Sequence, residues 1–339
     1  MSKADIYEVA KAAGVSISTV SRSFTRPELV SAKTRRKVLE IADKLDFNIS
    51  RSATALKSGQ TYRVAMLMNE EITSWFNTQV FAGIESLMPP AGYDISLFQH
   101  IDTAENRHEF FSELPVRRNV DAVFVASFAI DPHEVEQLKR IHVPIIGINT
   151  PSLEGFDATV SIDDEKGMYT ATQHLISLGH KRIVYPCSEA ATMSSSIDSR
   201  ARGFIRACED AQDKHDINWQ VLTVPRGPSF ADSALSALLA LDEFPDAICC
   251  QMDMMAIPLV IKLGRYGHLT PRDYSIVGFD DSPYSDTINL TTMRQDPYGM
   301  GRTAATKALK LINGEPLTTP HEVVDAQLVL RGTDAPYQG

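Results

Sequence analysis

Five neighbouring side chains near the start of the chain have the chemistry needed to contact DNA. Ile17, Ser18, Thr19, Ser21 and Arg22 combine short hydrogen-bonding groups and one apolar group with a guanidinium. On a helix, such side chains can contact base edges and phosphates in the major groove. This chemistry requires that the surrounding sequence forms a helix supported by a second one.

The sequence IYEVAKAAGVSISTVSRSF, residues 6–24, predicts two short helices joined by a tight turn. Apolar residues recur at i, i+3, i+4 and i+7 in its first half, at Ile6, Val9, Ala10 and Ala13. Gly14 permits a sharp turn, and Ser16 is a candidate N-cap for the second helix. Val20 and Phe24 then face the first helix. The segment therefore predicts a DNA-binding helix-turn-helix, with an ordinary helical hairpin as the alternative.

The distribution of charge supports a polyanionic partner for the first part of the chain only. Residues 1–60 contain 11 Lys and Arg against 6 Asp and Glu, a net charge of about +5. The remaining residues contain 22 against 37, about −15, and the whole chain carries −10. We therefore expect the basic segment alone to meet DNA, while the acidic remainder repels it.

Residues 31–45, SAKTRRKVLEIADKL, predict a third helix that begins after Ser31 as its cap. Its expected core face consists of apolar residues, namely Val38, Ile41, Ala42 and Leu45. Its first turns carry four cations, namely Lys33, Arg35, Arg36 and Lys37. These cations are either a solvated face or, for at least one of them, a contact with DNA phosphate.

Residues 48–62 predict a linker that forms a helix only with a partner, because the segment is short and polar. The partner is either DNA or the same segment of a second chain. Leu56 is its one large apolar residue. Its side chain either inserts between base steps in the minor groove or packs on the head, the unit formed by the three preceding helices.

The remaining residues, about 280, suffice for two ordinary domains. Short apolar runs that predict buried strands cover residues 63–68, 94–98, 121–126, 144–148, 182–186, 247–250 and 274–279. Amphipathic segments that predict helices alternate with them at Phe81–Met88, Pro132–Arg140, Lys166–Leu178, Arg200–Asp213, Asp232–Leu241, Met254–Tyr266 and Gly299–Ile312. This alternation is typical of parallel α/β sheets, and about twelve elements favour two subdomains.

Ligands of parallel α/β sheets bind beyond the carboxyl ends of the strands, so the loops that follow the predicted strands are candidate site loops. These loops contain acids, an arginine, amides, hydroxyls and an indole, and this set suits a sugar. Planar polar groups match adjacent hydroxyls, and an aromatic ring matches the apolar face of a pyranose. Each residue also has a structural alternative, since Trp75 could lie in the core and Asp253 or Asp164 could cap a helix.

Several other classes of protein lack support in the sequence. No apolar run of 18 residues exists and the N-terminus has no apolar signal core, so we expect a cytoplasmic protein without a membrane partner. The four cysteines, expected to be reduced and mostly buried, have no metal or disulfide spacing. Gly299-x-Gly301-x-x-Ala304 fits a loose dinucleotide fingerprint but lies in a predicted helix rather than after a strand. We expect no enzyme, no catalytic or metal-binding residue and no cofactor.

The N-terminal segment, called the head, resembles the Lac repressor (LacI/GalR) family of transcription regulators. The resemblance lies in three runs, namely IYEVAKAAGVSISTVSR, VSAKTRRKVLEIADKLDF and SRSATALKSGQT. The resemblance implies that Ile17, Ser18 and Arg22 contact bases, that neighbouring hydroxyls bind phosphate, and that Leu56 intercalates. One departure is Ile49-Ser50, where members commonly have Pro-Asn. The candidate DNA-binding residues are Tyr7, Ser16, Ile17, Ser18, Thr19, Ser21, Arg22, Ser31, Thr34, Arg51, Ala53 and Leu56.

The remainder also resembles this family, through HLISLGHKRIVYP, SRARGF, SIVGFDDS and LTTMRQDPYGMG. The resemblance implies a two-lobed core similar to periplasmic sugar-binding proteins, with three crossovers. It also implies effector contacts at Arg200, Phe279, Asp280 and Gln295. Met252 departs from the family, because many members have Asn before the following Asp. The candidate effector-binding residues are Trp75, Phe76, Ser127, Asn149, Ser196, Arg200, Met252, Asp253, Phe279, Asp280 and Gln295.

The expected organisation is a helix-turn-helix head (1–49), a hinge (50–61), a first lobe (62–162 and 293–325), a second lobe (163–292) and a C-terminal tail (326–339). The expected function is a homodimeric, sequence-specific repressor of carbohydrate-utilisation genes. Its partners are a near-palindromic double-stranded operator and a small sugar-derived effector. The alternatives are a purine- or phosphocarrier-responsive regulator of the same fold, or a sugar-binding transport-type protein.

Overall fold

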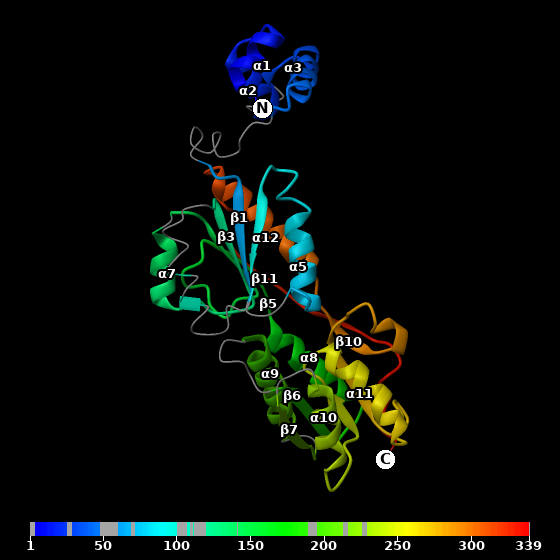
Figure 1. Cartoon of the computed structure of the whole chain (residues 1–339). Helices are drawn as coiled ribbons and strands as arrows, with labels where there is room; N and C mark the ends of the chain where they lie inside the picture. The colour runs from blue at the N-terminus through cyan, green and yellow to red at the C-terminus, as the bar shows by residue number, and fades with distance from the viewer. Residues whose placement is uncertain are drawn as a thin grey trace. The chain divides into compact units, whose positions relative to one another are not determined.

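The computed structural model describes residues 4–25, 29–47, 60–68, 72–99, 107–108, 111, 120–140, 142–188, 195–212, 216–225 and 229–338 (Figure 1). The chain divides into two compact units, residues 1–62 and 63–339. Among the described residues, no helix is both long enough and apolar enough to cross a bilayer.

The first unit, called the head, contains three helices: α1 (Ile6–Ala13), α2 (Ile17–Thr25) and α3 (Ala32–Lys44). A capping box between Asp5 and Glu8 begins α1, and Gly14 ends it at a φ of 64°. The buried core of the head consists of Val9, Ala10, Ala13, Val20, Val38 and Ala42. The predicted helix-turn-helix is confirmed, except that Leu45 is 36% exposed because α3 ends before it.

Two six-stranded sheets form the second unit. The first sheet has the order β11-β5-β4-β3-β1-β2, and all its pairs are parallel. Its strands are β1 (Arg63–Met68), β2 (Asp94–Phe98), β3 (Ala122–Ala126), β4 (Ile145–Ile148), β5 (Ala158–Ile162) and β11 (His321–Val324). The helices α5 (Trp75–Glu85), α7 (Pro132–Lys139) and α12 (Pro297–Ile312) belong to this first lobe.

The second sheet has the order β12-β10-β9-β8-β6-β7, in which only the β10–β12 pair is antiparallel. Its strands are β6 (Arg182–Ser188), β7 (Asn218–Val224), β8 (Ala247–Cys249), β9 (Ser275–Asp280), β10 (Thr291–Arg294) and β12 (Gln327–Val329). The helices of this second lobe are α8 (Asp164–Ser177), α9 (Ser195–Gln212), α10 (Phe230–Leu239) and α11 (Asp253–Arg265). A short 3-10 turn, η2 (Asp286–Ile288), precedes β10.

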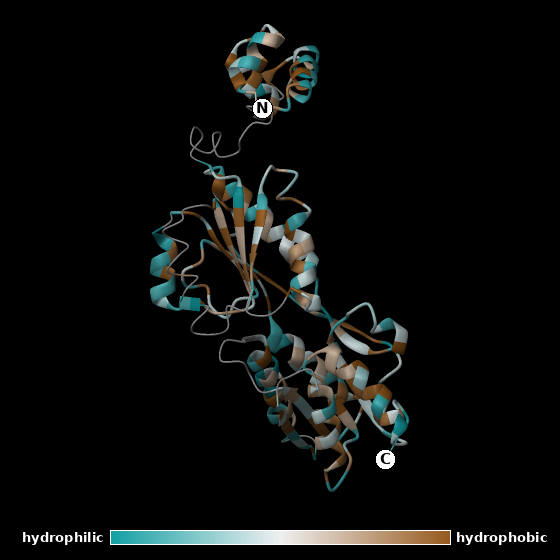
Figure 2. Cartoon of the chain, viewed as in Figure 1, coloured by the Kyte–Doolittle hydropathy of each residue, from teal (hydrophilic) through white to brown (hydrophobic). Residues whose placement is uncertain are grey.

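The central strands are buried because helices cover both faces of each sheet. All five residues of β3 are buried, and so are the last five residues of β1. Figure 2 shows these strands in brown, whereas the exposed side of α7 is teal. The predicted parallel α/β architecture with two subdomains is therefore confirmed. All four cysteines are free and buried, also as predicted.

The chain crosses between the two lobes three times: after β5, after β10, and between β11 and β12. Two predicted boundaries differ from the structure. Strand β10 keeps the chain in the second sheet as far as Arg294, whereas we expected the second lobe to end at residue 292. Residues 326–339 were expected to form a separate tail, yet β12 pairs with β10 and Tyr337 N donates to Leu178 O at 2.8 Å.

The dinucleotide-like glycines, Gly299 and Gly301, lie inside α12, as predicted, and Gly301 allows close helix packing. A Cβ on Gly301 would lie 2.2 Å from Val80 O of α5, so this glycine allows α12 and α5 to cross closely. The same crossing requires Gly83 of α5, where a Cβ would lie 2.2 Å from Tyr298 O. This close crossing fixes α5, whose first turn carries Trp75 and Phe76.

Candidate functional sites

The second helix of the head has an exposed face that carries polar side chains, whereas its Ser23 is buried. Ile17 is 39% exposed although apolar, and Ser18 and Arg22 are also exposed. Ser16 Oγ accepts a hydrogen bond from Thr19 N at 3.2 Å, so Ser16 caps α2 as predicted. The exposed face of α2 therefore offers hydroxyls and the guanidinium of Arg22 to an anionic partner, and the start of the helix adds the positive end of its dipole.

Outside α2, other candidate DNA-binding residues of the head are either exposed or take part in its local structure. Tyr7 is 66% exposed on α1. Ser31 caps α3 by accepting from Thr34 N at 3.2 Å. Arg35, one of the four cations of α3, donates through Nε to Ser23 O at 3.2 Å and so joins α3 to α2. Arg51, Ala53 and Leu56 lie outside the described residues, as does the predicted hinge helix.

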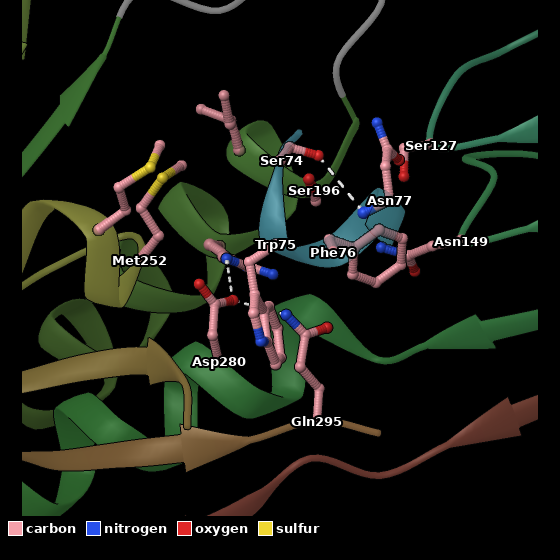
Figure 3. Close-up of a pocket in the computed structure, with 13 residues that line it drawn as sticks. Ser74, Trp75, Phe76, Asn77, Ser127, Asn149, Ser196, Met252, Asp280 and Gln295 are labelled. Atoms are coloured by element: carbon pink, nitrogen blue, oxygen red, sulfur yellow. Dashed lines mark hydrogen bonds and ion pairs between the residues drawn. The ribbon is translucent and has the colours of Figure 1, made fainter. Parts of the chain in front are cut away.

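A cavity of about 130 Å³ collects side chains from both lobes of the second unit (Figure 3). Nine predicted effector-binding residues line it: Trp75, Phe76, Ser127, Asn149, Ser196, Arg200, Met252, Asp280 and Gln295. Ser74 caps α5 by accepting from Asn77 N at 3.3 Å, and this places Trp75 and Phe76 in the first turn of the helix. The sequence predicted a loop here, with a helix only from Phe81.

Three lining residues stand at strand ends with a left-handed backbone. The φ angles are 65° at Ser127, 50° at Asn149 and 134° at Asp280. Such conformations are uncommon for residues other than glycine and occur often at functional sites. Each turns the chain at the carboxyl end of a strand, namely β3, β4 and β9, as the argument from parallel sheets predicted.

Arg200 is the centre of a buried polar network. Its Nε donates to Asp164 Oδ1 at 2.8 Å, and its Nη1 donates to Gln251 O at 2.7 Å. The guanidinium lies over the ring of Phe279 at 3.7 Å from its centroid. Asn149 Nδ2 donates to the other oxygen of Asp164 at 3.2 Å. The network therefore connects the first lobe, through Asn149, to α9 of the second lobe.

Asp280 forms a second part of this network. Gln295 Nε2 donates to Asp280 Oδ1 at 2.5 Å, and Arg200 Nη1 lies 3.7 Å from the same oxygen. Burial raises the pKa of Asp280 above its ordinary 3.8; Arg200 opposes this, while the charge of Asp253 adds to it. Gln295 lies in the chain crossing that follows β10, so Asp280 is bonded directly to a connection between the lobes.

Two predicted effector-binding residues do not line the cavity. Asp253 is fully buried, and its carboxylate accepts hydrogen bonds from Ser282 N at 2.9 Å, Thr292 Oγ1 at 2.7 Å and Ser285 Oγ at 2.5 Å. Phe279 is also fully buried, and its ring contacts the guanidinium of Arg200 rather than the cavity. Alternation along β9 points Phe279 into the protein, and the turn into α11 does the same for Asp253. Both residues therefore support the cavity residues from the interior.

The sequence did not single out Ser74, Asn77, Ile197 and Met254, which line the cavity. It indicated Asp164 only as a possible helix cap, whereas this residue holds Arg200. Asp164 follows β5, a strand that the apolar pattern did not predict, so the strand-end argument could have found it. Ile197 precedes Arg200 by three residues on α9 and shares its face. Among the described residues, no cluster of three His, Cys, Asp or Glu is arranged to hold a metal ion.

Comparisons with known families agree with this two-unit architecture. Residues 5–49 match the family described as bacterial regulatory proteins, lacI family, and residues 172–333 match a periplasmic binding protein-like domain. The HTH-type transcriptional repressor PurR of Photobacterium profundum is 29% identical over 308 residues, which cover 89% of this chain and 90% of that protein.

Two solved structures are similar to the whole chain or to most of it. The Lac repressor dimer bound to operator and the anti-inducer ONPF has a TM-score of 0.82 and 23% identity, over 98% of this chain and 100% of that chain. A LacI family regulator from Enterococcus faecium with bound ribose has a TM-score of 0.68 and 26% identity, over 81% of this chain and 100% of that chain. The chain therefore belongs to the Lac repressor family of bacterial transcription regulators.

Proposed function

We propose that this DNA-binding transcription regulator is a homodimeric repressor of carbohydrate-utilisation genes, controlled by a small sugar-derived effector in the cavity. The observation that carries this proposal is the pairing, in one cavity, of an aromatic wall with the polar network around Arg200. Its relatives are regulators rather than enzymes, and we propose that the cavity binds its ligand without catalysis. A DNA-bound regulator of this kind acts in the cytoplasm.

The cavity has the groups that a sugar requires. Trp75 and Phe76 offer aromatic faces for the apolar side of a sugar ring, as Figure 3 shows. Asn149, Asp280 and Arg200 offer planar donors and acceptors that match neighbouring hydroxyls. The related regulator from Enterococcus faecium was solved with bound ribose, which supports this ligand class.

The effector would act by changing the relative position of the lobes. Gln295 lies in a chain crossing and Asn149 bonds to Asp164 beside another, so a ligand that contacts them acts on two connections at once. To weaken operator binding 100-fold, the ligand must prefer the released state by roughly 2.7 kcal/mol, which is two tenfold steps. The proposed readout is the pairing of the two hinges of a dimer in the central minor groove.

At the operator, we propose that Ile17, Ser18 and Arg22 contact bases, whereas Ser16, Thr19 and Ser21 contact phosphates. The exposed face of α2, which carries Ile17, Ser18 and Arg22, supports this assignment. Each head of the dimer would bind one half-site of a near-palindromic operator. The hinge, with Arg51, Ala53 and Leu56, would bind between the half-sites.

A ligand screen combined with operator binding tests the proposal. Thermal unfolding of the full chain is measured with neutral mono- and oligosaccharides and with purines, and each ligand that raises Tm is then added to an operator-binding assay. We expect a saccharide to raise Tm and to change operator affinity at least tenfold. Trp75→Ala should abolish the ligand effect and leave operator binding without ligand intact.

Two outcomes would contradict parts of the proposal. If purines alone stabilise the chain, the ligand class is wrong although the regulator remains. If a saccharide binds without any change in operator affinity, the cavity does not control DNA binding.

A further inference from the structure

Asp164 compensates the charge of Arg200 before any ligand binds. The two side chains are only 6% and 7% exposed, and Nε donates to Oδ1 at 2.8 Å. Although burial lowers the pKa of Arg200, the carboxylates of Asp164 and Asp280 raise it overall. The guanidinium is therefore firmly charged, and its charge is already paired inside the protein.

Arg200 still has donors for a ligand. Its Nε bonds to Asp164 and its Nη1 to Gln251 O, and Nη2 has no hydrogen-bond partner among the described residues. These remaining N–H groups can donate to hydroxyl oxygens. Hydroxyl hydrogens can in turn reach the carboxylate of Asp280, which also lines the cavity.

Within the described part of the cavity lining, an anionic ligand would meet no second positive charge. Arg200 is the one cationic side chain among the described residues that line the cavity. The acids outnumber it, since Asp164 and Asp280 lie beside it and Asp253 lies behind Asp280. A phosphate or carboxylate group would bring negative charge into a buried site where Asp164 already neutralises the charge of Arg200, at a large cost in desolvation.

We propose that Asp164 determines ligand specificity, because by pairing with Arg200 it makes the cavity select uncharged polyhydroxylated ligands over phosphorylated or acidic ones. This inference rests on the proposed function, since it concerns the ligand of the same cavity. It goes further by assigning the choice between a free sugar and a sugar phosphate to one ion pair. Removing the carboxylate while Arg200 stays would turn the cavity into an anion site.

The test uses Asp164→Asn in the full-length chain, with D-ribose, D-ribose 5-phosphate and inorganic phosphate as probes. Binding is measured by calorimetry and by intrinsic tryptophan fluorescence, and folding is checked by thermal unfolding and operator binding. We expect the variant to bind ribose 5-phosphate at least tenfold more tightly than the wild type does. Inorganic phosphate should raise the Tm of the variant and leave the Tm of the wild type unchanged.

Matched variants separate charge from other effects of the substitution. Asn149→Gly removes the amide that meets Asp164 and tolerates the left-handed backbone, but it keeps the carboxylate, so it should gain no affinity for phosphate. The double variant Asp164→Asn/Arg200→Gln should lose the gain of the single variant. Asp164→Ser removes the same charge with a different side chain and serves if Asp164→Asn does not fold.

The outcomes distinguish this inference from the proposed function. If neither Asp164 variant gains affinity for either anion, or if the wild type already prefers ribose 5-phosphate to ribose, the assignment to Asp164 is wrong. Failure of every neutral saccharide to bind the wild type would instead overturn the sugar proposal. A gain that also occurs in Asn149→Gly would show that loosening of the lobes, rather than charge, admits the anion.

Discussion

Arg200 Nε and Asp164 Oδ1 lie 2.8 Å apart and join two elements of the second lobe, α9 and the start of α8. Through its other oxygen, Asp164 also accepts from Asn149 at the end of β4 in the first lobe. The ion pair therefore determines both the charge that a ligand meets and one of the contacts between the lobes. A ligand that hydrogen-bonds to Arg200 or Asn149 acts on the same network.

Asp280→Asn should change how stability depends on pH. Because folding raises the pKa of Asp280, the folded chain holds the proton more tightly, and stability falls as pH rises from 3.8 through the raised pKa. Each unit of pKa shift corresponds to about 1.4 kcal/mol. We expect the variant to reduce the fall in Tm between pH 5 and 9 by about 2–4 °C, measured by calorimetry. Parallel Tm curves for the two proteins would show that Asp280 ionises normally in the folded chain.

Gly83→Ala should destabilise the first lobe. Its Cβ would lie 2.2 Å from Tyr298 O and 2.9 Å from Arg302 N, so α5 and α12 would have to separate. We expect a loss of roughly 2–3 kcal/mol in the free energy of unfolding, together with weaker ligand binding because α5 carries Trp75. Gly264→Ala in α11 is the control, since its nearest contact would be 3.8 Å away. This control should be neutral or stabilising by about 0.5–1 kcal/mol, and equal losses in both variants would contradict the steric argument.

Arg22→Ala should cost roughly 1–3 kcal/mol of operator affinity at one base pair and relax sequence preference there. Because Arg22 is exposed on α2, removal of its side chain should leave the core of the head intact. Affinities for an operator and for single-base variants of it, at fixed salt, measure the effect. Lys37→Ala is the control, because it removes an exposed cation of α3 without removing a proposed base contact, so any loss of affinity should be equal for all sequences. The same uniform loss in Arg22→Ala would argue against base contact.

Asp334→Asn should weaken the attachment of the C-terminal segment to the second lobe at neutral pH. Although burial raises the pKa of Asp334, hydrogen bonds from His174, at 2.6 Å, and from Thr291 lower it overall. The carboxylate therefore contributes stability above pH 3.8, and this contribution is lost as pH falls through the lowered pKa. We expect a loss of about 1–2 kcal/mol at pH 7 that shrinks below pH 4, measured by thermal unfolding.

The control for Asp334→Asn is Asp325→Asn, which removes an exposed pair with Lys166 at 2.9 Å. Exposed pairs contribute little, so its Tm should stay within about 1–2 °C of the wild type. If Asp334→Asn behaves in the same way as this control, the C-terminal segment is held by other contacts.

The sequence predicted the head well because its signals are local. Helical spacing, Gly14 and the caps Ser16 and Ser31 act within one or two turns of the chain, and the structure has the helices where these signals predict them. The prediction failed at Leu45, where the apolar pattern continues one residue beyond the end of α3.

In the second unit, the sequence predicted strands where apolar runs are continuous, as in β1 and β3. It missed β5, β7 and β10–β12, whose residues alternate with polar ones or form short segments. Such segments become strands because a neighbouring strand already offers hydrogen bonds. Their positions therefore depend on the assembled sheet rather than on their own composition.

By itself, the sequence determined which strand ends carry the chemistry, including Asn149 and Asp280, because parallel strands bring their carboxyl ends to one edge. Only the tertiary structure decided which of these groups meet. It pairs Arg200 with Asp164 across 36 positions of sequence, and it directs Asp253 into the protein instead of the cavity. The reason is that a side chain's direction and its partner are determined by the packing of whole helices and sheets, which local spacing does not specify.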